Sequence, residues 1–220
     1  MRRRFQACVD EMDLYAGPVD TAPVSDNDIA TLPSAAQRYL RFMGMIGHTR
    51  EWSFRARFLG EFRQQTRQKF MPCEAWQYNT RLIPARIYYM RIAFACVLTM
   101  FGVDLYQAGH GRMRGKLLGM ITVADGSGQE FDLGELTTYV NDALMLAPSM
   151  LLTPAITWRA VDNESFDVSM SDGTITATSR FYVDEQGPHG RLQHHRSLGS
   201  SPGRVDSCTL DHADRRLDGS

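Results

Sequence analysis

The 220-residue chain carries 24 Lys and Arg against 25 Asp and Glu, a net charge of -1, and 43% of its residues are hydrophobic. That content is enough for one sizeable core, and the balanced charge excludes a global field that attracts nucleic acid or an anionic membrane. Any partner must therefore be recognised locally. Four scattered cysteines form no C-x-x-C pair, so we expect reduced thiols and neither a metal nor a cofactor. We expect a cytoplasmic protein without stable membrane insertion, because acidic residues interrupt the start of the chain and the longest apolar run is about half a membrane span.

Two helices are expected before the first strand. Residues 3–14 can form a short helix with Phe5, Val9 and Met12 along one side, and a loop continues to about residue 30. The second helix has Pro33 in its first turn, and glycines follow its end. Its apolar positions follow helical spacing: Leu32, Ala36, Tyr39, Leu40 and Met43.

From Trp52 the apolar period changes to two, which is typical of a half-buried strand. A third helix is expected from Asp132, with Glu135 completing a capping box, to just before Pro148. The residues at 172–173, Asp-Gly, are a strong hairpin signal. Further strands are expected at 69–80, 86–94, 97–107, 112–118, 156–161, 165–170 and 174–183.

Short links between consecutive strands favour antiparallel pairing, since parallel pairing needs crossover helices. We therefore predict an α+β fold. One curved, half-barrel-like antiparallel sheet of seven or eight strands carries two or three helices on its concave face.

The chain after Gly187 is polar and has no period of either kind. Its residues can be encoded so that the next reading frame spells a strand-like peptide. We therefore interpret residues 1–187 as a single α+β domain and residues 188–220 as a disordered tail that follows an extra nucleotide. The alternative is a natural, solvated tail. Loss of the final strands would leave an unpaired edge at 174–183, open to self-association.

Four segments, 32–40, 71–78, 104–113 and 134–140, resemble DUF6544 (also DUF6920), a bacterial family of unknown function. The resemblance extends over about residues 30–187. It implies a fold similar to the curved-sheet carriers of lipoproteins and no established activity. The chain departs from the family at Thr138, where members carry Arg, and near Asp142 and Met145, where they carry Glu and Trp.

Asp104, Tyr106 and His110 are candidate catalytic residues, because alternate strand positions share a face and His titrates near neutrality. The alternative is a structural hydrogen-bond cluster at a strand end. Arg55 and Arg57 alternate with aromatic residues, which places the two kinds on opposite faces and argues against nucleic-acid binding.

Aromatic residues are more abundant than a thin sheet needs, so the sheet and its helices can enclose an apolar cavity. The candidate ligand-binding residues are Trp76, Tyr78, Tyr89, Phe94 and Tyr139. The alternative is an ordinary packed core. Three functions remain open: a non-catalytic binder of a lipid-like or apolar small molecule, an enzyme using Asp104 and His110, and a structural or interaction domain.

Overall fold

The computed structural model describes residues 2–13, 19–20, 22–63, 69–94, 98–184, 187–188 and 193–194. None of the helices in these ranges is long and apolar enough to cross a lipid bilayer. The elements in chain order are α1 (Arg2–Asp13), α2 (Asp26–Ile29), α3 (Ser34–Phe42), β1 (Ser53–Phe62), β2 (Met71–Thr80), β3 (Ala85–Phe94), β4 (Leu98–Gln107), β5 (His110–Leu117), β6 (Ile121–Ser127), α4 (Gln129–Leu146), the 3-10 helix η1 (Pro148–Leu151), β7 (Ile156–Ala160), β8 (Ser165–Asp172), β9 (Ile175–Asp184), β10 (Gly187–Pro188) and β11 (Gln193–His194).

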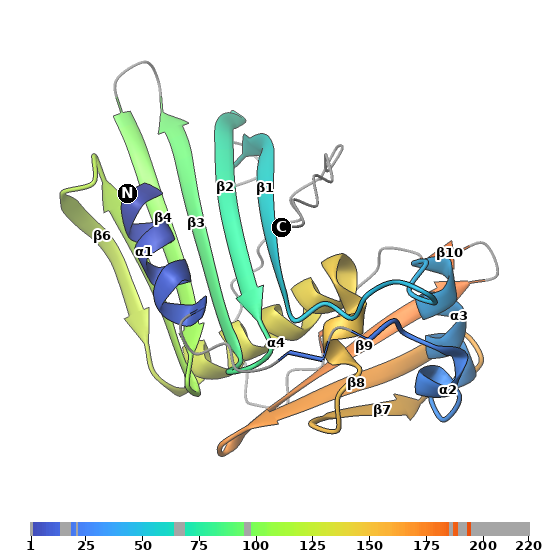
Figure 1. Ribbon diagram of the computed structural model, residues 1–220. Helices are drawn as coiled ribbons and strands as arrows, with labels where there is room; N and C mark the ends of the chain where they lie inside the picture. Colours follow the sequence, from blue (N-terminus) through green and yellow to red (C-terminus); the bar gives the residue numbers. More distant parts are fainter. Residues whose placement is uncertain are drawn as a thin grey trace.

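The strands form two antiparallel sheets, and neither closes into a barrel. Strands β1 to β6 pair in chain order in the larger sheet, and β7, β8 and β9 form the smaller one (Figure 1). The expected α+β class with antiparallel strands is confirmed. The expectation of one sheet of seven or eight strands is wrong, because α4 separates β6 from β7. Its 18 residues carry the chain about 27 Å away from β6, and β7 then pairs with β8 in the smaller sheet.

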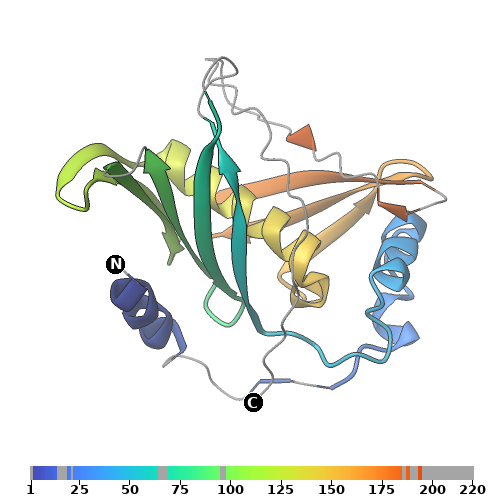
Figure 2. The same ribbon diagram turned by 90° about the horizontal axis from the view of Figure 1, so that it is seen from above.

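Helix α4 lies between the two sheets (Figure 2). Its apolar residues at 136, 140, 143 and 144 belong to the main core, together with α3 and the smaller sheet. The hydroxyl of Tyr39 on α3 donates to the carbonyl of Leu144 at 2.5 Å, and the Tyr39 ring lies 4.7 Å from that of Phe181 on β9. The main core therefore lies where α3 and α4 meet on one face of the smaller sheet.

Helix α1 packs on the opposite face of the larger sheet. Val9 and Met12 are buried there against Tyr78, Ala85 and Ile87. The neighbouring residue on β3, Arg86, points to the other face and contacts α4. The helices thus cover both faces of the larger sheet, whereas the sequence pattern predicts them on one concave face.

The start of α4 differs from the expected capping box at Asp132 and Glu135. The helix begins at Gln129, after Gly128 with a φ of 106°. The Asp132 carboxylate instead accepts a 2.7 Å hydrogen bond from the backbone N–H of Gly111. This bond ties the first turn of α4 to the β4–β5 hairpin.

Part of the β9 edge that the sequence analysis expected to be unpaired carries the short strands β10 and β11. They pair with β9 at Ser179, Arg180, Val183 and Asp184. The expected out-of-frame tail falls mostly on residues outside the described ranges. Within them, residues 187–188 and 193–194 lie beside β9.

Candidate functional site

The face of the larger sheet that is turned toward α4, here called the inner face, has two parts. Directly cross-strand residues share a face, so the register places Gln77, Tyr88 and Asp104 in one row of this face. Helix α4 contacts the sheet only at the end where β1 begins, and the opposite end extends beyond it (Figure 1). A polar cluster lies under the helix, and an apolar surface lies beyond it.

The polar cluster is centred on Arg86, whose side chain is only 6% exposed. Its Nε donates to Asp142 Oδ2 at 2.7 Å, and its Nη1 donates to Glu135 Oε2 at 2.9 Å. The Gln77 amide donates to the same Asp142 oxygen at 2.7 Å and to Asn79 Oδ1 at 2.9 Å. Two residues from α4 and three from the sheet therefore form one buried network.

Carboxylates outnumber the cation in this cluster, because Asp104 also lies on the inner face beside Arg86. Burial raises the pKa of Glu135 to about 7, against the lowering effect of Arg86. Burial also raises the pKa values of Asp104 and Asp142. One guanidinium cannot neutralise three buried carboxylates, so burial favours the protonated form of Glu135.

The inner face beyond Tyr88, here called the apolar half, carries no charged side chain. Ala75 and Ile92 are buried within it, whereas Leu98 and Ile121 at its rim are 41% and 58% exposed. None of its members belongs to either core cluster of the described residues. The register assigns these residues to the apolar half: Phe58, Phe62, Met71, Cys73, Ala75, Met90, Ile92, Phe94, Leu98, Met100, Leu117 and Ile121.

Tyr88 connects the two parts. The Arg86 guanidinium lies 5.2 Å from the centre of its ring, and the centre of the Phe58 ring lies 6.3 Å from it. Along β3, the side chains of the inner face thus change from charged to apolar. Such a surface suits an amphipathic molecule.

The structure does not bring the five predicted ligand-binding residues together. Trp76 and Tyr89 pair on the opposite, outer face, with ring centres 5.5 Å apart, and Tyr78 packs against α1 there. Tyr139 is buried on α4 and donates to the carbonyl of Thr80 at 3.0 Å. Only Phe94 lies in the apolar half. In the sequence, only the alternation of faces along β3 distinguishes Phe94, on the inner face, from Tyr89, on the outer face.

Two of the three catalytic candidates lie on the inner face. Asp104 joins the polar cluster, and the hydroxyl of the fully buried Tyr106 donates to Asp172 Oδ2 at 2.7 Å. His110 is exposed and pairs with Gln107, which places it on the outer face. Asp104 and His110 therefore do not form an acid and base pair.

Sequence reasoning missed Arg86, Gln77 and the role of Glu135. Arg86 is 49 residues from Glu135 and 56 from Asp142, so no local spacing indicates the network. The one available signal was the charge of Arg86, because the neighbouring residues on the same face of β3 are apolar. Among the residues that the structure describes, no group of three or more His, Cys, Asp or Glu is arranged to hold a metal ion.

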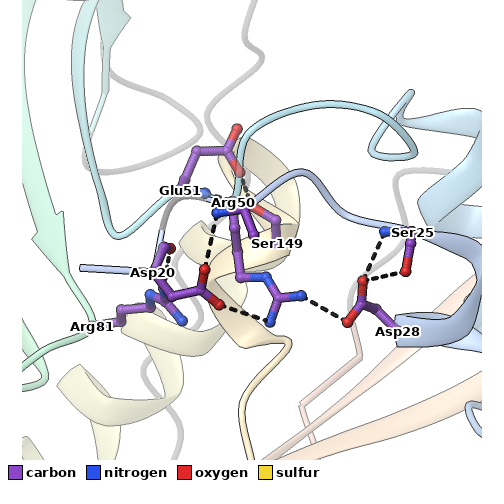
Figure 3. Close-up of polar contacts among 8 residues, drawn as sticks. Asp20, Ser25, Asp28, Arg50, Glu51, Arg81 and Ser149 are labelled. Atoms are coloured by element: carbon purple, nitrogen blue, oxygen red, sulfur yellow. Dashed lines mark hydrogen bonds and ion pairs between the residues drawn. The ribbon is translucent and has the colours of Figure 1, made fainter.

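A second polar group surrounds Arg50 on the approach to β1 (Figure 3). Its Nη2 donates to Asp28 Oδ1 at 2.8 Å, and its Nη1 lies 3.8 Å from Asp20 Oδ2. Hydrogen bonds from Ser25, followed by that from Arg50, lower the pKa of Asp28 to about 2. Next to it, the Ser149 hydroxyl donates to the Glu51 carboxylate. This group ties the segment before α2 to η1.

A pocket of about 220 Å³ lies beside Arg50 and Asp28, with Trp158 on its wall. Arg50 is already paired with two carboxylates, which offset its charge, and its buried Nε has no hydrogen-bond partner among the described residues. We assign this region a structural role. The pocket is lined by Asp28, Leu32, Arg50, Leu152, Thr153, Pro154, Ile156 and Trp158.

Comparison with known proteins gives one match. The model of a family of unknown function, DUF6544, matches residues 22–206. No curated protein and no solved structure matches the chain. The matched range continues past Gly187, and the frameshift near that residue stays a prediction.

Proposed function

We propose that this chain, which belongs to the DUF6544 family of unknown function, binds a lipid-like or other apolar small molecule without transforming it. The observation that carries the proposal is the apolar half of the inner face. Its side chains come from six neighbouring strands and include no charge. Most of these side chains are half-buried and two at the rim are exposed, and a contiguous apolar surface that stays partly exposed marks a binding site in soluble proteins.

The size of the apolar half favours a lipid-sized ligand. A molecule that covers roughly 300 Å² of such a surface gains about 7 kcal/mol from apolar burial, before the costs of association. Those costs amount to several kcal/mol whatever the size of the ligand, so a small aromatic fragment binds poorly here.

The neighbouring polar cluster supports an amphipathic ligand. Glu135 and Asp142 are 13% and 15% exposed, so both carboxylates remain accessible at the edge of α4. The amide nitrogen of the buried Asn79 has no hydrogen-bond partner among the described residues. A polar group at one end of the ligand can accept a hydrogen bond from this amide, since a buried donor without a partner is costly.

Ligand retention tests the proposal. The protein, purified without detergent, is examined by native mass spectrometry, and displacement of the fluorescent fatty acid cis-parinaric acid measures affinity. Met100→Glu places a charge in the middle of the apolar half, and Thr99→Glu places the same charge on the outer face of the same strand. We expect Met100→Glu to weaken probe binding at least tenfold and Thr99→Glu to leave it unchanged. Equal affinities in two folded variants contradict the proposal.

Acid–base catalysis is a second candidate, and the pKa of about 7 at Glu135 favours it. Asp104 and Glu135 then act on the polar end of the bound molecule, and His110 has no part. Incubation with extracted lipids followed by mass spectrometry distinguishes the two functions. Conversion that Asp104→Asn abolishes favours an enzyme, and recovery of the unchanged lipid favours a binder.

A further inference from the structure

The end of the larger sheet that is distant from α4 carries an unusual number of exposed apolar side chains. The connections β1–β2, β3–β4 and β5–β6 all lie at this end, here called the hairpin end (Figure 1). Of the twelve exposed large apolar residues in the described part of the chain, seven lie here. They are Leu59, Phe70, Leu98, Leu118, Met120, Ile121 and Val123.

The β5–β6 turn carries the most exposed of these apolar side chains. Met120 is 77% exposed and Leu118 is 43% exposed, and Leu118 has a φ of 53°. Gly, Asn and Asp are the usual residues at turn positions with positive φ, because a branched side chain is strained there. A large apolar side chain that is exposed to water at this position does not stabilise the fold.

The hairpin end of the sheet is also basic. The described residues of 57–74, 91–101 and 116–123 include five cations, Arg57, Arg63, Lys69, Arg91 and Lys116, and two anions, Glu61 and Glu74. These described residues carry a net charge of +3 in a chain whose net charge is -1. Apolar side chains at a tip with cations behind them match the headgroup boundary of an anionic bilayer.

We infer that the hairpin end docks reversibly on an anionic lipid surface, with Leu118, Met120 and Ile121 entering the headgroup boundary. The apolar half of the inner face opens at this same end, through Phe94, Leu98 and Leu117. Docking therefore places the proposed binding surface against the bilayer, where an apolar ligand can exchange without crossing water. This consequence rests on the proposed function, but the docking itself does not.

A second copy of the chain is a poorer occupant. A symmetric dimer through the hairpin end brings two surfaces of net charge +3 together, and like charges in one interface are unfavourable. An anionic membrane satisfies both the charge and the apolar side chains.

Vesicle flotation with the full chain tests the inference. Vesicles of phosphatidylcholine alone are compared with vesicles that also contain phosphatidylglycerol, at low and high salt. We expect the protein to bind only the anionic vesicles. High salt should decrease the bound fraction at least fivefold. Met120→Glu changes a side chain that is 77% exposed and should reduce the bound fraction at least fivefold. The matched control, Phe42→Glu on α3, changes a side chain that is 60% exposed at a distant site and should bind like the wild type.

Three outcomes overturn the inference: absence of binding to anionic vesicles, equal binding of Met120→Glu and the wild type, or a dimer in sedimentation that Met120→Glu dissociates. Failure of the proposed function is visible separately. In that case cis-parinaric acid does not bind, whereas vesicle binding and its sensitivity to Met120→Glu persist.

Discussion

Arg86 on β3 donates a 2.7 Å hydrogen bond from its Nε to Asp142 on α4, 56 residues later in the chain. Together with the bond to Glu135, this contact holds α4 over one end of the larger sheet. The helix covers only that end of the sheet, and the other half of the inner face lies outside both core clusters. One buried cation thus positions the boundary between the folded core and the proposed binding surface.

The first prediction concerns that cation. Replacement of Arg86 by Met leaves three carboxylates in a buried site without their partner, so we expect the free energy of unfolding to fall by about 3–5 kcal/mol. Urea denaturation measures the change. The control is Arg91→Met on the same strand, whose side chain is 54% exposed and 3.7 Å from Glu74. It should cost less than about 1 kcal/mol. Similar losses in both variants contradict the role of the cluster.

The second prediction concerns pH. The folded-state pKa of Glu135, about 7, lies above its ordinary value of 4.5, so the folded protein retains a proton that the unfolded chain has released between these values. The free energy of unfolding therefore decreases as the pH rises from 4.5 to 7. Asp104 and Asp142, whose pKa values burial also raises, act in the same direction.

Glu135→Gln should flatten this pH dependence, because the amide resembles the protonated acid and does not titrate. Urea denaturation at a series of pH values measures the slope. The exposed Glu130, in the first turn of the same helix, provides the control Glu130→Gln, which should keep the wild-type slope. An unchanged slope in Glu135→Gln means that the cluster does not exchange a proton near neutrality.

The third prediction concerns the contact between the β4–β5 hairpin and the start of α4. A Cβ at Gly111 would lie 2.3 Å from the backbone oxygen of Phe131, and its three nearest atoms all belong to the backbone of Phe131 and Asp132, which cannot rotate aside as a flexible side chain can. We expect Gly111→Ala to lower the free energy of unfolding by about 1–3 kcal/mol. Gly134→Ala in the middle of α4 meets nothing within 4 Å and should raise it by about 0.5–1 kcal/mol. Thermal denaturation of both variants checks the opposite signs, and a shared sign refutes the argument.

The elements with a regular apolar period were predictable. The alternation from Trp52 predicts β1, the helical spacing after Pro33 predicts α3, and Asp-Gly at 172–173 predicts the β8–β9 hairpin, where Gly173 has a φ of 59°. Strand β6 was not predictable in this way. It is an edge strand with exposed Ile121 and Val123, and its residues Asp125 and Gly126 are typical of a turn.

The candidate site was only partly predictable. Period two assigns Met90, Ile92 and Phe94 to one face of β3, but it does not say whether α4 covers that face. Asp104 was a candidate from the sequence, whereas its association with Arg86 and Glu135 depends on a helix that packs across the sheet. His110 was grouped with Asp104 because of proximity in the chain, and the hairpin register places it on the outer face.

The sequence by itself determined which segments are helix and strand wherever one period dominates, because backbone pairing and the side-chain period are local properties. It also determined the absence of charge from the positions that became the apolar half. Only the tertiary structure decided the division into two sheets, the position of α4 between them and the buried network around Arg86. Those features depend on contacts between residues some 50 positions apart, and such contacts form only when the helix and both sheets bury their apolar faces together.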